Sequence, residues 1–185
     1  ETTPNPVGPY AMTHYAAEDA VLEAVREGEF SGIVLRLSNS FGAPTDPDVN
    51  CWQLLVNDLA RQAVTTNRLI LRSSGEQQRD FISISNVGRA ITHFCKLNGD
   101  STGIVNIGGQ ISCSVVEMAS YVADCYFVAF GKRLHIDRKS SSEIHLPRLD
   151  FRNDKLLGTG FRLSMDQDEE MARLLQFCNT VFCKC

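Results

Sequence analysis

Four side chains are of types that bind ligands or take part in reactions, and each stands where the predicted fold could expose it to a ligand. Tyr10 and His14 stand four residues apart in a segment with helical periodicity, so they share one face of a helix. Asn39 follows a short apolar strand, at the strand end where open α/β folds bind ligands. Arg79 carries a planar guanidinium, which suits bidentate hydrogen bonding to phosphate oxygens. In a functional interpretation, these side chains would contact a small-molecule ligand.

Three of these side chains, and Arg36 in the neighbouring strand, also have a structural interpretation. A tyrosine at a helix start commonly packs through its ring, and Asn39, between two serines, can hydrogen-bond to local backbone alone. Arg79 can pair with the adjacent Asp80. Arg36 lies inside the apolar strand, and we interpret it as a structural residue paired with a carboxylate. For Tyr10, Asn39 and Arg79 both interpretations stay open on these residues alone.

Composition and charge restrict the class of partner. With 185 residues, 43% of them apolar, the chain can bury a substantial core. Lys and Arg number 18 against 22 Asp and Glu, a net charge of −4, and no basic run provides a footprint for nucleic acid or an acidic membrane. No apolar stretch approaches the roughly 18 residues of a membrane span, and the first residues do not resemble a signal peptide. We expect a soluble protein with a small-molecule partner.

The seven cysteines indicate a reducing compartment. Their number is odd and they are scattered through apolar segments, which favours free thiols over a disulfide framework. The sequence therefore predicts a cytoplasmic protein. The pair Cys183 and Cys185 could bind a soft metal, but no second pair stands at zinc-ligand spacing, so no metal site is expected.

An alternation of helices and strands must position the four side chains. Alanines and valines recur at helical spacing over 10–27, and Gly28 ends that helix. The run 32–37 is typical of a strand covered on both faces in a parallel sheet, and 38–44 forms a loop after it. Further strands are expected over 69–72, 80–84 and 103–107, and a further helix over 52–64. Another helix is expected to follow a cap at Ser85, with Val87, Ala90, Ile91 and Phe94 on one face. Two more helices are expected, one from the Ser114–Glu117 capping box to about Phe130 and one that starts at 166–169. This alternation predicts the α/β class.

The first helix and strand do not form a complete domain by themselves. A buried parallel strand near the start of the chain requires neighbouring strands that this sequence does not supply. A Gly-rich strand-to-helix turn that could hold a pyrophosphate is also missing, because Gly108-Gly109 is too short for that motif. We expect the rest of this sheet to lie outside the chain.

Five sequence blocks resemble the extended short-chain dehydrogenases/reductases, the group that contains nucleotide-sugar epimerases and dehydratases. The blocks follow the family's order and cover nearly the whole chain. They are 1–18 around Tyr10, 34–44 with Arg36, Asn39 and Gly42-Ala43-Pro44, 78–90 with Arg79-Asp80-Phe81, 106–109, and 149–158.

The resemblance implies an NAD- or NADP-dependent enzyme that epimerises, dehydrates or reduces a nucleotide-activated sugar. In this family a tyrosine exchanges a proton with a substrate hydroxyl while a hydride moves to or from the nicotinamide, and Tyr10 stands at that position. Asn39 matches a residue that contacts the sugar or phosphate. Arg79 matches the arginine that reaches the nucleotide-sugar diphosphate. Phe41 matches a wall of the nicotinamide pocket, and an ordinary core position is its alternative.

The resemblance also implies a domain organisation. Residues 1–48 would be the C-terminal remnant of a doubly wound, Rossmann-type parallel sheet. Residues 49–185 would be mainly a small mixed α/β substrate-binding domain, with some segments returning to the sheet. The NAD(P)-binding motif is then expected in an N-terminal half outside this chain. The chain alone is therefore expected to be inactive, and the full-length enzyme to be a homodimer.

One residue departs from the family pattern. The family has a lysine four residues after the tyrosine, where this sequence has His14. In the family that lysine bonds the nicotinamide ribose, and its charge favours the ionised tyrosine. An imidazole can still donate to a ribose hydroxyl, although it is largely neutral at neutral pH. His14 is thus assigned to cofactor binding and catalysis in place of the lysine, and a non-catalytic relative that binds a dinucleotide or a protein partner is the alternative.

Overall fold

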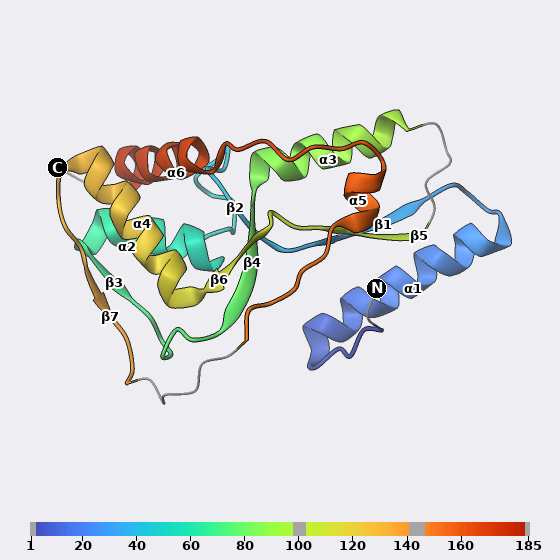
Figure 1. Cartoon of the computed structure of the whole chain (residues 1–185), viewed down its shortest axis with the longest axis horizontal. Helices are drawn as coiled ribbons and strands as arrows, with labels where there is room; N and C mark the ends of the chain where they lie inside the picture. Colours follow the sequence, from blue (N-terminus) through green and yellow to red (C-terminus); the bar gives the residue numbers. More distant parts are fainter. Residues whose placement is uncertain (1–2, 98–102, 141–146, 184–185) are drawn as a thin grey trace.

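The structure is a computed structural model that describes residues 3–97, 103–140 and 147–183 (Figure 1). Its helices are α1 (Pro9–Glu27), α2 (Leu55–Thr66), α3 (Ile84–Lys96), α4 (Val115–Phe130), α5 (Asp154–Gly158) and α6 (Gln167–Phe182). Its strands are β1 (Ile33–Leu37), β2 (Asn39–Phe41), β3 (Arg68–Ile70), β4 (Gln78–Ser83), β5 (Gly103–Ile107), β6 (Ile111–Ser114) and β7 (His135–Asp137).

The strands form three small sheets that are mostly parallel. β1 pairs with β5, and Ile33 lies opposite Gly103. β2 pairs in parallel with β4, which pairs antiparallel with β6, and β3 pairs in parallel with β7. Helices alternate with these strands along the chain, so the predicted α/β class is confirmed.

Two hydrophobic clusters fill the interior, and β4 runs between them. α2, α4 and α6 pack on one another at one end of the molecule, whereas α1 and α3 lie on opposite sides of the β1–β5 pair (Figure 1). Phe81 belongs to the cluster under α2, α4 and α6, and the next residue, Ile82, belongs to the cluster of α3, β5 and α5. Because successive strand residues point to opposite faces, one strand contributes to both cores.

Three sequence expectations about local structure agree with the structure. α1 ends where Gly28 adopts a left-handed conformation, with φ of 78°. α4 begins with a complete capping box, in which the Ser114 side chain accepts from the Glu117 backbone and the Glu117 side chain accepts from the Ser114 backbone. The strand 103–107 has the expected bounds.

Other expectations were wrong. The segment 38–44, expected to be a loop, contains the strand β2, and β6, β7 and α5 were not anticipated. The cap of α3 is Ser83, whose hydroxyl accepts from the Asn86 backbone at 3.2 Å, while Ser85 lies inside the first turn. Ile91 is 45% exposed and does not belong to the buried face of α3. The missed elements are short, and two nearby serines, Ser83 and Ser85, were both candidates for the N-cap of α3.

Candidate functional site

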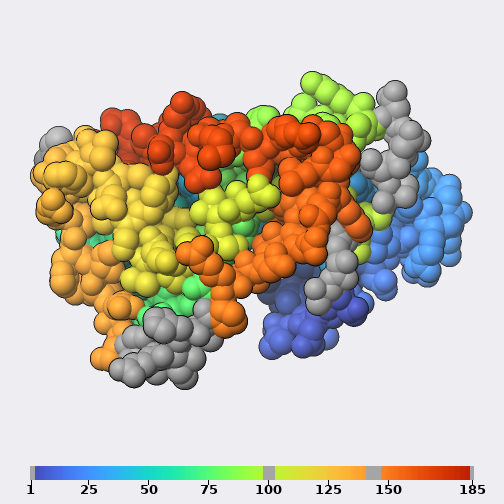
Figure 2. Space-filling view, in the orientation of Figure 1, coloured from blue at the N-terminus to red at the C-terminus, as the bar shows by residue number. Residues whose placement is uncertain are grey.

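Helix α1 presents Tyr10 and His14 side by side on its surface. Pro9 stands in the first helical turn, where its missing N–H costs nothing. The Tyr10 ring is 78% exposed, and its centroid lies 4.4 Å from that of His14. Both side chains line a hollow of about 950 Å³, which β1 and Asn39 also line. The space-filling view shows α1, in blue, projecting at the side of the molecule away from α4 and β7 (Figure 2).

An ion pair connects α1 to the strand beneath it. The Arg36 Nε atom donates to Glu18 Oε2 at 2.8 Å, and a second guanidinium nitrogen donates to Glu18 Oε1. Hydrogen bonding from Arg36 lowers the pKa of Glu18, an effect larger than the opposing cost of burial. The expectation that Arg36 pairs with a carboxylate is confirmed. None of the α1 residues is buried, so this pair is a main link that orients the helix.

Asn39 and Arg79 are brought together by the parallel pairing of β2 with β4. The Asn39 amide nitrogen donates to the Asp80 carbonyl at 3.0 Å, and the Asn39 amide oxygen accepts from Arg79 at 3.3 Å. Arg79 also donates to the Gln77 side chain at 3.3 Å. The Asn39 amide is thus held at both ends, and it directs the guanidinium of Arg79.

Asp80 is buried on the opposite face of β4 and does not share the environment of Arg79. It is 1% exposed, and its Oδ1 accepts from the Gly109 backbone at 2.8 Å. Burial raises the pKa of the Asp80 carboxyl, and this outweighs the lowering effect of hydrogen bonding from the Gly109 backbone; Asp80 Oδ2 and the Ser38 hydroxyl are buried without a hydrogen-bond partner. The alternative in which Arg79 pairs with Asp80 is wrong, because Arg79 bonds Asn39 and Gln77 instead.

A second hollow adjoins Arg79 and contains residues that the sequence did not single out. It has a volume of about 560 Å³ and is also lined by Trp52, Arg61 and Arg72. An aromatic ring beside guanidinium groups is a combination that can hold a nucleotide. These residues lie on separate elements, so only the folded chain brings them near Arg79.

Phe41 lies in the core in this structure. It is 2% exposed and belongs to the cluster that contains residues of α2 and α6. Its assignment to the wall of a nicotinamide pocket stays a prediction.

Neither a metal cluster nor a membrane span occurs among the described residues. Across 3–97, 103–140 and 147–183, no group of three or more His, Cys, Asp or Glu side chains could hold a metal ion. In the same ranges no helix is long and apolar enough to cross a membrane. Cys185, one half of the cysteine pair considered above, lies outside the described residues.

Comparisons with known proteins agree with this architecture. A Methanocaldococcus jannaschii protein, provisionally assigned as a UDP-glucose 4-epimerase, is 24% identical over 94% of this chain and 54% of its own length. The structure of RMD from Pseudomonas aeruginosa complexed with NADPH matches with a TM-score of 0.77 at 20% identity, over 96% of this chain and 58% of the other. A dTDP-glucose 4,6-dehydratase from Bacillus anthracis in complex with NAD matches with a TM-score of 0.74 at 19% identity, over 98% and 55%.

The structural matches show a shared Rossmann-type fold, and this chain spans about half the length of the relatives that it matches. The model of the NAD dependent epimerase/dehydratase family matches residues 1–108, more than half of the chain. The chain belongs to the NAD dependent epimerase/dehydratase family.

Proposed function

We propose that this chain is the substrate-binding, C-terminal part of an NAD(P)-dependent enzyme that epimerises, dehydrates or reduces a nucleotide-activated sugar. The observation that carries the proposal is that Tyr10, His14 and Asn39 line one hollow, and that Asn39 is bonded to Arg79. A proton-transferring phenol, a ribose-facing imidazole and a phosphate-binding guanidinium are then neighbours around one substrate.

In this mechanism each of the four residues has a separate role. The nicotinamide, when bound, accepts or donates the hydride. The Tyr10 hydroxyl exchanges a proton with a sugar hydroxyl, and its 78% exposure leaves it accessible to a ligand. His14 donates from its imidazole to the nicotinamide ribose. Asn39 hydrogen-bonds the sugar or the adjoining phosphate, and the Arg79 guanidinium binds the diphosphate oxygens.

The residues present fit only one end of the dinucleotide. The hollow beside Tyr10 and His14 can accept the nicotinamide and its ribose, whereas the sequence holds no Gly-rich turn for the pyrophosphate. The chain also spans only 54% of its M. jannaschii relative. We therefore propose that a dinucleotide-binding half outside this chain completes the enzyme and that the chain alone is inactive.

Substitutions in α1 test the catalytic assignment. In a protein that carries this chain behind its dinucleotide-binding half, Tyr10→Phe should reduce turnover at least about 100-fold, the usual contribution of general acid/base catalysis. His14→Lys should raise the turnover rate at neutral pH and move the alkaline limb of the rate profile to lower pH, because an ammonium stays charged and favours the ionised phenol. Turnover and pH profile would be followed by cofactor absorbance and product analysis.

The alternative is a non-catalytic relative that binds a dinucleotide or a protein partner, and His14 in place of lysine is the observation that favours it. Full turnover by Tyr10→Phe together with an unchanged profile for His14→Lys would refute the catalytic assignment. Nucleotide binding without any turnover by the unmodified protein would establish the alternative.

A further inference from the structure

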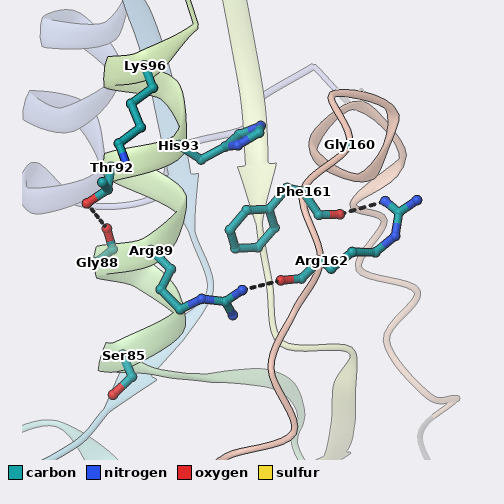
Figure 3. A pocket seen from close by; sticks show the side chains of 9 residues that line it. All are labelled: Ser85, Gly88, Arg89, Thr92, His93, Lys96, Gly160, Phe161 and Arg162. Atoms are coloured by element: carbon teal, nitrogen blue, oxygen red, sulfur yellow. Dashed lines mark hydrogen bonds between the residues drawn. The ribbon is translucent and has the colours of Figure 1, made fainter.

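Another hollow lies along α3, and neither Tyr10 nor Asn39 lines it. Nine residues of α3 and of the segment 160–162 line a hollow of about 660 Å³ (Figure 3). None of them lines the hollows that contain Tyr10 or Arg79. The proposed reaction makes no use of this region.

The lining of the α3 hollow is basic in a chain whose net charge is −4. It includes Arg89, Lys96 and Arg162 together with His93, and none of the nine lining residues is acidic. Within the part of the chain that the structure describes, none of the three cations forms an ion pair. Two carboxylates are bonded to residues beside the hollow: Glu170 accepts from Ser85, and Asp166 accepts at 3.2 Å from the Asn86 side chain, to which Arg89 also donates. The three cations are therefore not neutralised by carboxylates of the described chain.

Arg89 is held in a fixed orientation at the centre of this surface. It donates to the Asn86 side chain at 2.8 Å and to the Arg162 carbonyl at 2.9 Å, and its guanidinium lies 5.2 Å from the centre of the Phe161 ring. A guanidinium has five N–H donors, so donors remain for a ligand after these two bonds. Because Arg89 is already ordered, ligand binding would not have to restrict its side chain.

The other polar groups are distributed along the helix around Arg89. Figure 3 shows Arg89 and His93 directed toward the segment 160–162, and Lys96 extending back along α3 toward Thr92. The His93 ring is bonded to Thr159 at 2.8 Å. Gly88 leaves the helix surface open, since a Cβ there would meet nothing within 4 Å. Lys96 is exposed, and its flexible side chain can swing to a ligand over Gly88 and Arg89.

We infer that the α3 hollow binds a small anion that carries a diphosphate. Arg89 and Lys96 are seven residues apart, which corresponds to about 10 Å along a helix at 1.5 Å per residue. A single phosphate is too small to contact both ends of such a row, whereas two linked phosphates can be bound by Arg89 and Lys96. The Arg162 guanidinium donates to the carbonyls of Leu157 and Phe161 and is directed away from α3 (Figure 3), so it is not one of the proposed ligands. Inorganic pyrophosphate and the diphosphate of a nucleotide share this chemistry.

The test measures pyrophosphate binding to a variant that lacks Arg79, the proposed ligand of the substrate diphosphate. Isothermal titration of the Arg79→Ala chain with inorganic pyrophosphate at low ionic strength should show binding that weakens as salt is added. Adding Lys96→Gln should reduce the affinity by about tenfold or more, as expected for the loss of a charge-assisted hydrogen bond. The matched control, Lys132→Gln, removes the same charge from an exposed segment elsewhere and should change the affinity by less than about twofold.

Several results would overturn the inference. No binding in the Arg79→Ala chain would show that the α3 hollow does not bind pyrophosphate, and equal losses in Lys96→Gln and Lys132→Gln would show a nonspecific charge effect. Inorganic phosphate binding as tightly as pyrophosphate would refute the diphosphate assignment. Backbone NMR shifts confined to 85–96 and 160–162 would support it, and tighter binding of ADP than of pyrophosphate would identify a nucleotide as the source. Among the described residues the Lys96 side chain makes no hydrogen bond or ion pair, so Lys96→Gln is expected to fold for this titration.

Discussion

Substitution of Glu18 tests whether one ion pair orients the helix that carries Tyr10. In Glu18→Gln the charge is lost and one of the two acceptor oxygens becomes an amide, so Arg36 keeps at most one of its two bonds to this side chain. None of the α1 residues is buried, so little hydrophobic burial compensates for the loss. The effect is therefore expected to fall mainly on α1.

The expected magnitude follows from the burial of the two side chains. A hydrogen bond to a charged group contributes about 1.5–3 kcal/mol, and breaking a fully buried ion pair costs about 3–5 kcal/mol. The side chains of Arg36 and Glu18 are 23% and 13% exposed, so this pair lies between an exposed and a buried one. We expect Glu18→Gln to lower the free energy of unfolding of the α1–β1 contact by about 2–3 kcal/mol.

Hydrogen exchange of α1 amides measures this loss directly, with urea unfolding as the global readout. Glu23→Gln, an exposed acid on the same helix, is the control and should change stability by less than about 0.5 kcal/mol. Because the pKa of Glu18 is lowered in the folded protein, its contribution is present above the unfolded pKa and is lost as pH falls through the folded pKa. The unmodified chain and Glu18→Gln should therefore converge at acidic pH. Equal losses at positions 18 and 23, or a difference that persists unchanged in acid, would contradict the reasoning.

Three further predictions concern β4 and the glycines. Arg79→Ala in the complete enzyme should weaken nucleotide-sugar binding by about 1.5–3 kcal/mol in calorimetry and leave cofactor affinity nearly unchanged; equal losses would indicate a folding role. Gly109→Ala places a Cβ 1.9 Å from the Phe81 carbonyl oxygen and should lower the free energy of unfolding by more than about 2 kcal/mol, as measured by urea unfolding. Gly88→Ala adds a Cβ in open space on a helix and should raise the free energy of unfolding by about 0.5–1 kcal/mol. Burial raises the pKa of Asp80, so its charged form opposes folding as pH rises through the folded pKa. Asp80→Asn should therefore be at least as stable as the unmodified chain at neutral pH and lose that advantage below the unfolded pKa, as thermal unfolding across pH can check.

Elements with strong local signals were predictable from sequence. The helix 10–27 has helical periodicity, a proline in its first turn and a terminal glycine, and the capping box fixes the start of α4. The strand 103–107 is a run of β-favouring residues after a glycine. The strands of three residues, such as β2 and β7, have no comparable signal, because tertiary pairing with β4 and β3 creates them.

The candidate site was predictable residue by residue but not in its geometry. The spacing of Tyr10 and His14 gave their shared face, because both lie on one helix. The bond between Asn39 and Arg79 depends on the parallel register of β2 with β4, in which Asn39 lies opposite Phe81. Trp52, Arg61 and Arg72 reach the same hollow as Arg79 from other elements, and no local pattern encodes that convergence.

The alternation of β4 explains why adjacent residues of opposite charge have separate roles. Arg79 and Phe81 point to one face, where Phe81 enters the core under α2 and Arg79 lines the hollow beside Trp52. Asp80 and Ile82 point to the other face, where Ile82 enters the second core and Asp80 accepts from Gly109. Arg79 is thus held by Asn39 and not by its neighbour's charge. A substitution at Asp80 should act on the 109–111 turn, and one at Arg79 should act on the ligand, so the two effects can be separated by measuring stability and binding on the same pair of variants.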